Sequence, residues 1–415
     1  KMKFVLDSGI ASGDTMLTVS SNSAWQWGAG TRPQTFDWGN IEVENAATWG
    51  TGAGVSKRVT LYTGAALTLN NYSITSAMHT AGNFEYGLST NTTTPTASTV
   101  SATQIYFDRN QFKNGREEIT SAGTGIRYGG TSTMGNTTTG NRLKLSGAFI
   151  WPNDVMGGYT QSQVGDATGN EVIIENGAGL GNNIEGYGGF SANGNATNNT
   201  IILNGTHPSM AGFAFLSGGR SGNGAADVTT GNTLQIKNKN NGAWAISNFE
   251  KMKFDLAGIN NGETMLTTTY MDSSINWSDI SVDNMATWVQ NHMTPSSGPQ
   301  RITLYSGGAL PLIGTAPTGM TTGNYEYGVS ANPGNTKLYF DANAFKNGQV
   351  TVSTSLSGSY GGKSTLGNHV RDNKLTIAGG SSWESNKGVY GGYNQSLNTS
   401  NVNGLDATGN ELVFK

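Results

Sequence analysis

Apolar and polar residues alternate in short runs throughout the chain. In the run DATGNEVIIENG, Val172 and Ile174 stand two positions apart. Residues i and i+2 of a strand point to the same side of a sheet, so these two side chains are expected to face one interior. Three further runs repeat the pattern: Leu143 and Leu145, Ile201 and Leu203, Leu234 and Ile236. The alternation predicts short strands, and no long stretch with the helical period of 3.6 competes with it.

An asparagine precedes each of these runs and recurs about every 30 residues. The four are separated by 29, 29 and 33 positions: Asn141, Asn170, Asn199 and Asn232. Gly-rich stretches such as MGGYTQS and GYGGFSANG come before them, and Asn and Gly readily adopt the positive φ of sharp turns. A coil of about 30 residues cannot bury its apolar side alone, whereas stacked coils can. The chain is therefore predicted to be all-β, a right-handed parallel β-helix (β-solenoid) with loop insertions.

A longer repeat contains several of these coils. KMKF at residue 1 returns at 251, RVTLYTGAAL at 58 returns as RITLYSGGAL at 301, and YGGTSTMGN at 128 returns as YGGKSTLGN at 360. These matches predict a first long unit at residues 1–250 and a second, truncated unit at 251–415 of the same continuous solenoid. The matched blocks drift in spacing, which predicts inserted surface loops around 20–38, 72–101 and 290–299.

The phrase DATGN occurs once in each long unit. We expect it to form a corner of the solenoid, with backbone geometry as the reason for its residues. Calcium-binding repeats require Asp and Gly at a strict nine-residue spacing, which this sequence lacks. Six residues are predicted to be structural corner residues: Asp166, Gly169, Asn170, Asp406, Gly409 and Asn410.

The composition narrows the classes of partner. The 415 residues include 60 Gly, only 12% are charged, and the net charge is −3 with no run of Lys or Arg. Nucleic acid and anionic membrane surfaces are therefore poor partners. No apolar run reaches the roughly 18 residues that span a bilayer, so we expect no direct membrane insertion. The absence of cysteine excludes disulfides, Cys-zinc sites and Cys nucleophiles, and it suits a bacterial protein exported unfolded.

Few residues are suited to catalysis or metal binding. The four histidines (His79, His207, His292 and His369) show no metal-binding spacing. Asp108 matches Asp341 and Glu85 matches Glu326 in the second unit, and this recurrence favours a structural role. Each Asp is expected to cap a short turn before FKNG. We therefore predict a non-enzymatic protein with no catalytic residue, metal or cofactor.

Tryptophans provide the candidate ligand-binding residues. Trp49 and Trp288 occupy matching positions in the two units, which predicts a buried stacking role. Trp25 and Trp27 lie in the polar, Gly-rich stretch SAWQWGAG, which has no clear counterpart. Exposed aromatic rings flanked by polar residues can bind sugars or proteins, so Trp25 and Trp27 are candidates for ligand binding.

The Gly-Gly-Tyr blocks VMGGYTQS and GVYGGYNQS, followed by GDATGNEVIIENG, resemble the passenger regions of large bacterial type V autotransporters. This resemblance implies a β-helical stalk at the extracellular bacterial surface, or secreted, exported through a C-terminal β-barrel translocator that this fragment lacks. It also implies an adhesin or haemagglutinin-like protein in attachment, aggregation or biofilm. Its partners would be a host-cell glycoprotein, a glycan or another bacterial surface. The GDSGS block of the serine protease members is absent, and GDT at Gly13 lacks the nucleophilic Ser of the esterase members.

Two alternatives remain open from the sequence. The chain can be a structural filament or spacer repeat without a ligand. It can also be a polysaccharide-active enzyme or a phage tail fibre on the same fold, which clustered carboxylates in one groove would favour.

Overall fold

The computed structural model describes residues 1–19, 35–51, 56–73, 78–91, 98–161, 165–205, 214–353, 355–356, 359–366, 368–379, 382–383, 388–394 and 407–415. It is a parallel β-solenoid of about 11 turns with 56% of its residues in strands. The predicted all-β solenoid is confirmed, whereas its right-handed sense stays a prediction. The chain divides into two compact units, Lys1–Ile202 with Leu216–Thr233 and Leu203–Phe215 with Leu234–Lys415.

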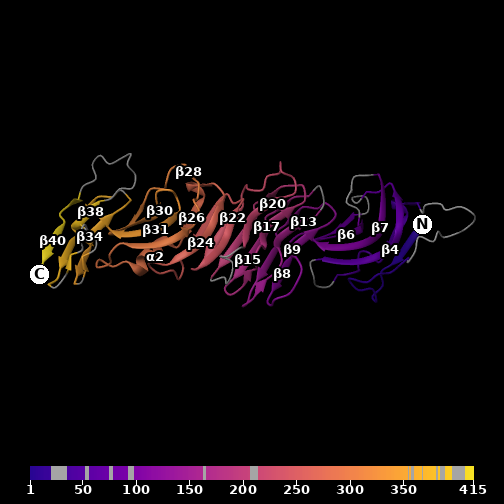
Figure 1. Cartoon of the computed structure of the whole chain (residues 1–415), viewed down its shortest axis with the longest axis horizontal. Helices are drawn as coiled ribbons and strands as arrows, with labels where there is room; N and C mark the ends of the chain where they lie inside the picture. The colour runs from indigo at the N-terminus through magenta and orange to yellow at the C-terminus, as the bar shows by residue number, and fades with distance from the viewer. Residues whose placement is uncertain are drawn as a thin grey trace, which may run out of the picture. The chain divides into compact units, whose positions relative to one another are not determined.

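The parallel coils that begin at β8 contain up to four strands each. Strands of the same kind pair in parallel with their counterparts in the next coil, as β9, β13 and β17 do in Figure 1. The strands are β8 (Arg116–Ile119), β9 (Arg127–Ser132), β10 (Thr138–Thr139), β11 (Arg142–Leu145), β12 (Ile150–Trp151), β13 (Val155–Thr160), β14 (Ala167–Thr168), β15 (Glu171–Glu175), β16 (Gly179–Leu180), β17 (Glu185–Ser191), β18 (Ala196–Thr197), β19 (Thr200–Asn204), β20 (Phe215–Ser221) and β21 (Thr233–Lys237).

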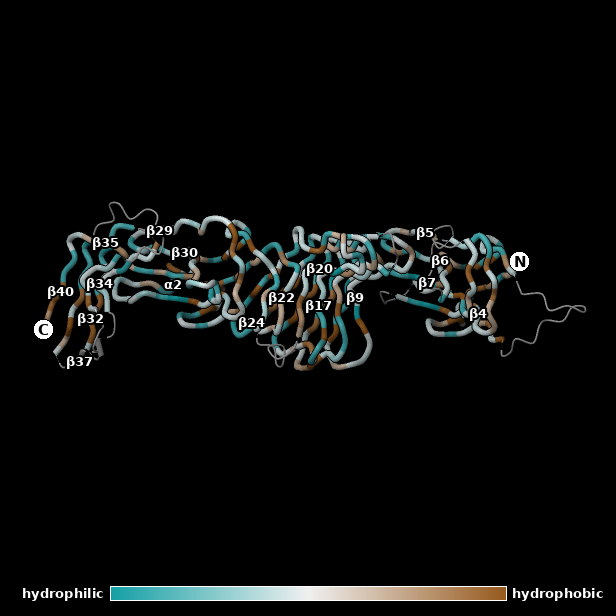
Figure 2. Tube along the Cα trace, turned by 45° about the horizontal axis from the view of Figure 1, so that its top comes forward, coloured by the Kyte–Doolittle hydropathy of each residue, from teal (hydrophilic) through white to brown (hydrophobic). Residues whose placement is uncertain are grey.

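Apolar ladders fill the interior of these coils. Leu143 stands opposite Val172 and Leu145 stands opposite Ile174 in the parallel register of β11 and β15. All four side chains are fully buried. The alternation read from the sequence therefore places apolar residues of neighbouring coils above one another, where each coil covers the next. Figure 2 colours these strands by hydropathy.

An antiparallel sheet precedes the regular coils in the first unit. The long strand β4 pairs antiparallel with β7, β7 pairs with β6, and β6 pairs with β5. Within the insertion expected as a loop around 72–101, residues 78–81, 84–90 and 99–101 thus form strands. The strands outside the coils are β1 (Met2–Val5), β2 (Thr35–Asp37), β3 (Ile41–Glu44), β4 (Ser56–Asn70), β5 (Met78–Ala81), β6 (Phe84–Thr90) and β7 (Thr99–Gln111), with a 3-10 turn η1 (Trp38–Asn40).

The second unit repeats this order. Its antiparallel strands β27, β31, β30 and β29 correspond to β4, β7, β6 and β5, and parallel strands follow. Its elements are β22 (Asn241–Ser247), β23 (Lys251–Asp255), β24 (Thr264–Asp272), β25 (Ile275–Asn276), η3 (Trp277–Asp279), β26 (Ile280–Asp283), α2 (Met285–His292), β27 (Gln300–Ser306), β28 (Leu312–Ile313), β29 (Met320–Thr322), β30 (Tyr325–Ala331), β31 (Lys337–Ala344), β32 (Gln349–Val352), β33 (Ser355–Leu356), β34 (Ser359–Ser364), β35 (Val370–Arg371), β36 (Lys374–Ile377), β37 (Ser382–Trp383), β38 (Val389–Asn394), β39 (Ala407–Thr408) and β40 (Glu411–Phe414).

Helix α2 corresponds to a turn in the described part of the first unit, at residues 45–50. Both segments begin at an asparagine with positive φ, Asn284 at 64° and Asn45 at 60°. The first unit then reaches Gly50, whose φ of 68° ends the turn. The second unit has Val289 at the matching position, and the helix continues to His292. The exchange of Gly50 for Val289 thus accompanies the change from a turn to a helix between the two segments.

Candidate functional site

A ladder of buried asparagines runs along one corner of the first unit. Asn170 Oδ1 accepts hydrogen bonds from the backbone N and Nδ2 of Asn141, at 3.2 and 2.8 Å. The N and Nδ2 of Asn170 in turn donate to Asn199 Oδ1, at 3.0 and 3.1 Å. Asn199 repeats the contact with Asn232. Each amide thus satisfies polar groups of the next coil in a place that water does not reach.

The Gly-Gly pairs stand opposite this ladder. A Cβ atom on Gly158 would lie 2.4 Å from the side chain of Asn170, and one on Gly130 would lie 2.2 Å from Asn141. Neither glycine has a positive φ, so close approach and not turn geometry requires them. The sequence shows the Gly-Gly stretch and the asparagine as separate features. In the structure they pack against each other.

The predicted corner residues divide between two roles. Gly169 and Gly409 take φ values of 66° and 65°, the positive φ expected of the corner. The side chain of Asn170 lies in the buried ladder, and Asn410 Oδ1 accepts from Asn373 Nδ2 at 2.9 Å. Asp166 Oδ1 accepts from the backbone N of Asn195 at 2.7 Å. Asp406, Trp25 and Trp27 lie outside the described residues.

The recurring aspartates are buried, and each forms an ion pair with an exposed arginine. Asp108 accepts from Arg58 Nε and Nη2, at 2.5 and 2.8 Å, and from Ser89 Oγ at 2.5 Å. Asp341 has the same partners in the second unit, Arg301 at 2.6 and 3.1 Å and Ser330 at 2.6 Å. The expectation that these aspartates cap a turn was wrong, because both lie within long antiparallel strands.

Glu85 joins the antiparallel sheet to the first parallel coil. Its fully buried carboxylate accepts from Ser132 Oγ at 2.7 Å, Thr133 N at 2.8 Å, and Asn110 and Asn136 Nδ2 at 2.9 and 2.8 Å. Burial raises the pKa of Glu85, and these four hydrogen bonds oppose that rise. Glu326 has a matching set of four donors in the second unit: Asn343, Ser364, Thr365 and Asn368.

Metal ligands do not gather in the part of the chain that the structure describes. No group of three His, Asp or Glu side chains there could hold an ion. His79 stacks on Tyr86, with ring centroids 5.5 Å apart, and His292 stacks on Trp288 at 4.4 Å. Among the same residues, none of the helices has the length and apolar character needed to cross a bilayer.

Trp49 and Trp288 occupy equivalent buried positions. The Nε1 of Trp49 donates to the backbone O of Ile10 at 2.9 Å, and that of Trp288 donates to Ile259 at 2.6 Å. Each indole packs edge-on against a phenylalanine of the antiparallel sheet. Both side chains are therefore anchored at their polar and apolar ends.

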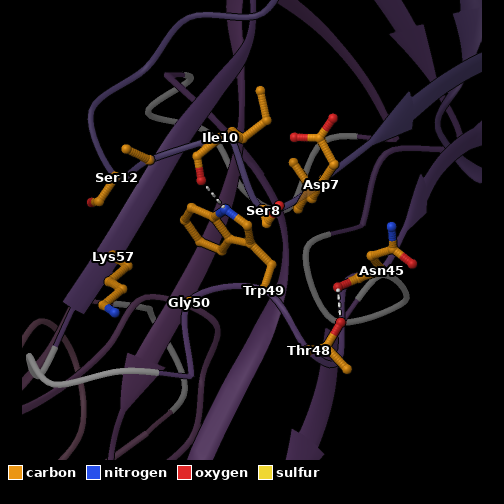
Figure 3. Close-up of a pocket in the computed structure, with 11 residues that line it drawn as sticks. Asp7, Ser8, Ile10, Ser12, Asn45, Thr48, Trp49, Gly50 and Lys57 are labelled. Carbon is orange, nitrogen blue, oxygen red and sulfur yellow. Dashed lines mark hydrogen bonds between the residues drawn. The ribbon is translucent and has the colours of Figure 1, made fainter.

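A pocket of about 610 Å³ opens beside Trp49 in the first unit (Figure 3). Its lining combines an indole, hydroxyl groups, an amide, a carboxylate and an amine. The eleven lining residues are Leu6, Asp7, Ser8, Ile10, Ala11, Ser12, Asn45, Thr48, Trp49, Gly50 and Lys57. The sequence did not reveal this pocket, because the matching positions of Trp49 and Trp288 indicated a core residue only. The signal was the exchange of Val289 for Gly50 between the two units.

Comparison of the chain with protein-family models, with curated proteins and with solved structures gives no match. The resemblance to autotransporter passenger regions therefore stays a prediction beyond the solenoid fold and its repeats.

Proposed function

We propose that this chain is a non-enzymatic stalk segment of a bacterial cell-surface adhesin that works in attachment. The recurrence of the same internal contacts supports this proposal most directly. The asparagine ladder extends through successive coils, and the Arg–Asp pair and the buried glutamate recur in both units. A repeating solenoid of this kind is stabilised by nearest-neighbour contacts and can be extended by adding coils.

The burial and the hydrogen bonds of the recurring carboxylates also support a structural function. Glycosidases hold two carboxyl groups on either side of a sugar, free to transfer protons. Asp108 and Glu85 are instead buried and held by partners from neighbouring strands, and their counterparts in the second unit are held in the same way. A group in such a position supports the fold and does not contact a polysaccharide.

Attachment can be tested with beads coated with the whole chain. We expect such beads to adhere to epithelial cells or to one another more than albumin-coated beads do. A Trp25→Ala/Trp27→Ala variant tests the hypothesis that these two tryptophans bind the ligand. The matched control is Tyr270→Ala, which removes an aromatic ring that is 55% exposed. Adhesion at the albumin level by a folded chain would reject attachment and favour a spacer without a ligand. Release of reducing sugars from polysaccharides would favour the enzyme.

A further inference from the structure

One cation, Lys57, lines the Trp49 pocket, and a second, Arg109, lies beside it in the sheet. Lys57 on β4 stands directly opposite Arg109 on β7 in the antiparallel register. The corresponding register pair of the second unit is Gln300 and Ala342, which are both neutral. The same strands thus pair without any charge at this position, and the fold does not require the two cations.

Gly50 makes room for this pair. A Cβ atom on Gly50 would lie 3.2 Å from Lys57 Cδ and 3.4 Å from Arg109 Cδ. The second unit has a fully buried valine, Val289, at the matching position. Three neighbouring positions therefore differ together between the units: a small residue and two cations in one, and an apolar residue with two neutral residues in the other.

Arg109 is buried without an anionic partner. Its side chain is only 6% exposed, Nη1 donates to Ala47 O at 3.2 Å, and the buried Nε has no hydrogen-bond partner. Neither Arg109 nor Lys57 forms an ion pair with any residue that the structure describes. The Arg109 guanidinium lies over the rings of Phe84 and Tyr86, 4.8 and 5.7 Å from their centroids, and these rings compensate part of its charge. The positive charge that remains without an acidic partner favours an external anion.

The lining of the pocket includes Asn45. The matching residue of the second unit, Asn284, forms a hydrogen bond within the protein. Asn284 Nδ2 donates to Asp255 Oδ1 at 2.6 Å in the second unit. The first unit has Val5 at the position of Asp255, as KMKFV against KMKFD shows, and a valine cannot accept that hydrogen bond. Asn45 is exposed and lines the pocket. Its amide therefore lacks the internal carboxylate partner that Asn284 has.

We propose that this pocket binds a saccharide unit that carries a carboxylate or sulfate group, an inference that rests on the proposed attachment function. Lys57 binds the anionic group, and Arg109 behind it is a positioning residue that adds positive potential. Asn45 and Asp7 bind ring hydroxyls. Figure 3 places Asp7 and Lys57 on opposite sides of Trp49, which separates a hydroxyl-accepting end from an anion-binding end. A polyacidic peptide fits less well, because it has no ring hydroxyls for Asn45 and Asp7 to bind.

Calorimetry with the whole chain tests this proposal. The probes are an oligogalacturonate, a sulfated heparin tetrasaccharide, a neutral galactose oligomer, hexaglutamate and inorganic sulfate. We expect saturable binding of an acidic saccharide, at least roughly tenfold tighter than the neutral oligomer, the peptide or free sulfate. Binding should weaken as the salt concentration rises, because salt screens exposed charges.

Lys57→Gln introduces the residue that the second unit uses at this position, so the variant is expected to fold. It should weaken binding of the acidic saccharide roughly tenfold or more. Lys144→Gln, which removes a half-buried lysine paired with Glu118 elsewhere in the unit, is the matched control and should leave the affinity within about twofold.

Unchanged binding by Lys57→Gln, equal binding of hexaglutamate or of the neutral oligomer, or no binding of any acidic saccharide would overturn the proposal. Adhesion of coated beads separates this failure from that of the proposed function. If the beads adhere while the acidic saccharides do not bind, only the pocket assignment is wrong.

Discussion

At the scale of single residues, one buried amide determines the corner of each coil. Asn170 is 1% exposed and bonds to a coil on either side through Asn141 and Asn199. Its Nδ2 also donates to Thr138 O at 3.1 Å. Because a buried polar group without a partner is costly, every coil in the ladder depends on the amide of its neighbour.

Replacing Asn170 with Ala should strongly destabilise the first unit. The substitution leaves the N and Nδ2 of Asn141 and the O of Thr138 without their partner. Each unsatisfied buried group costs about 1–3 kcal/mol, so we expect the free energy of unfolding to fall by about 3 kcal/mol or more. Urea denaturation followed by circular dichroism measures this change. Asn410→Ala, at a half-buried position, should cost about 1 kcal/mol, and equal losses for the two variants would contradict the ladder argument.

At the scale of elements, Glu85 fastens the antiparallel sheet to the parallel coils. It lies on β6, and three of its four donors come from the segment just after β9 or from its end. The repeat of this arrangement at Glu326 shows that the junction is built in the same way twice. The antiparallel insertion is therefore an integral part of each unit.

The junction should make stability depend on pH. Because burial raises the pKa of Glu85, the native state holds this proton to a higher pH than the unfolded chain does. The free energy of unfolding should then fall as the pH rises from about 4.5 through the raised pKa. The free energy of unfolding is measured by urea denaturation at each pH for the wild type and for Glu85→Gln. The difference between the two isolates the contribution of the Glu85 carboxyl group.

An exposed glutamate provides the control for that experiment. Hydrogen bonds from Ser146 and Lys144 lower the pKa of Glu118. The difference in the free energy of unfolding between the wild type and Glu118→Gln should therefore change with pH in the opposite direction. Stability from this group should be lost as the pH falls below about 4.5. A difference curve for Glu85 that is flat, or that rises with pH, would show that its four hydrogen bonds outweigh burial.

At the scale of the whole molecule, contacts in a solenoid connect each coil mainly to its neighbours. The asparagine ladder of the first unit and the Asn373–Asn410 pair of the second are separate sets of hydrogen bonds. A defect in one set should therefore remain local, unlike a defect in a single globular core.

Hydrogen exchange of the Asn170→Ala variant tests this locality. The backbone amide of Asn141 should lose protection on the order of 100-fold, because it donates to the removed Oδ1 of Asn170. The amide of Thr200, which donates to the backbone O of residue 170, should lose protection as the corner around it loosens. The backbone amide of Asn373, which donates to Asn410 Oδ1, should exchange at its wild-type rate. A uniform loss of protection along the chain would indicate one cooperative structure instead.

Periodicity alone was sufficient to predict the repeating part of the fold. The alternation of Leu143, Leu145, Val172 and Ile174 and the spacing of the asparagines determine a coil that must stack, because no other arrangement buries these residues. The recurrence of whole phrases likewise predicted two similar units. These signals are local or periodic, so they can be recognised in the sequence without any knowledge of tertiary contacts.

Tertiary structure decided what the individual polar residues do. The sequence cannot show that Gly158 faces Asn170, that Asp108 pairs with Arg58, or that Glu85 has four donors, because these partners are 12 to about 50 residues apart and meet only when the strands pair. The pocket beside Trp49 has the same origin. A turn contributes Gly50, and two antiparallel strands contribute Lys57 and Arg109. Only the folded chain brings the two cations next to the glycine, whose lack of a side chain leaves space beside them.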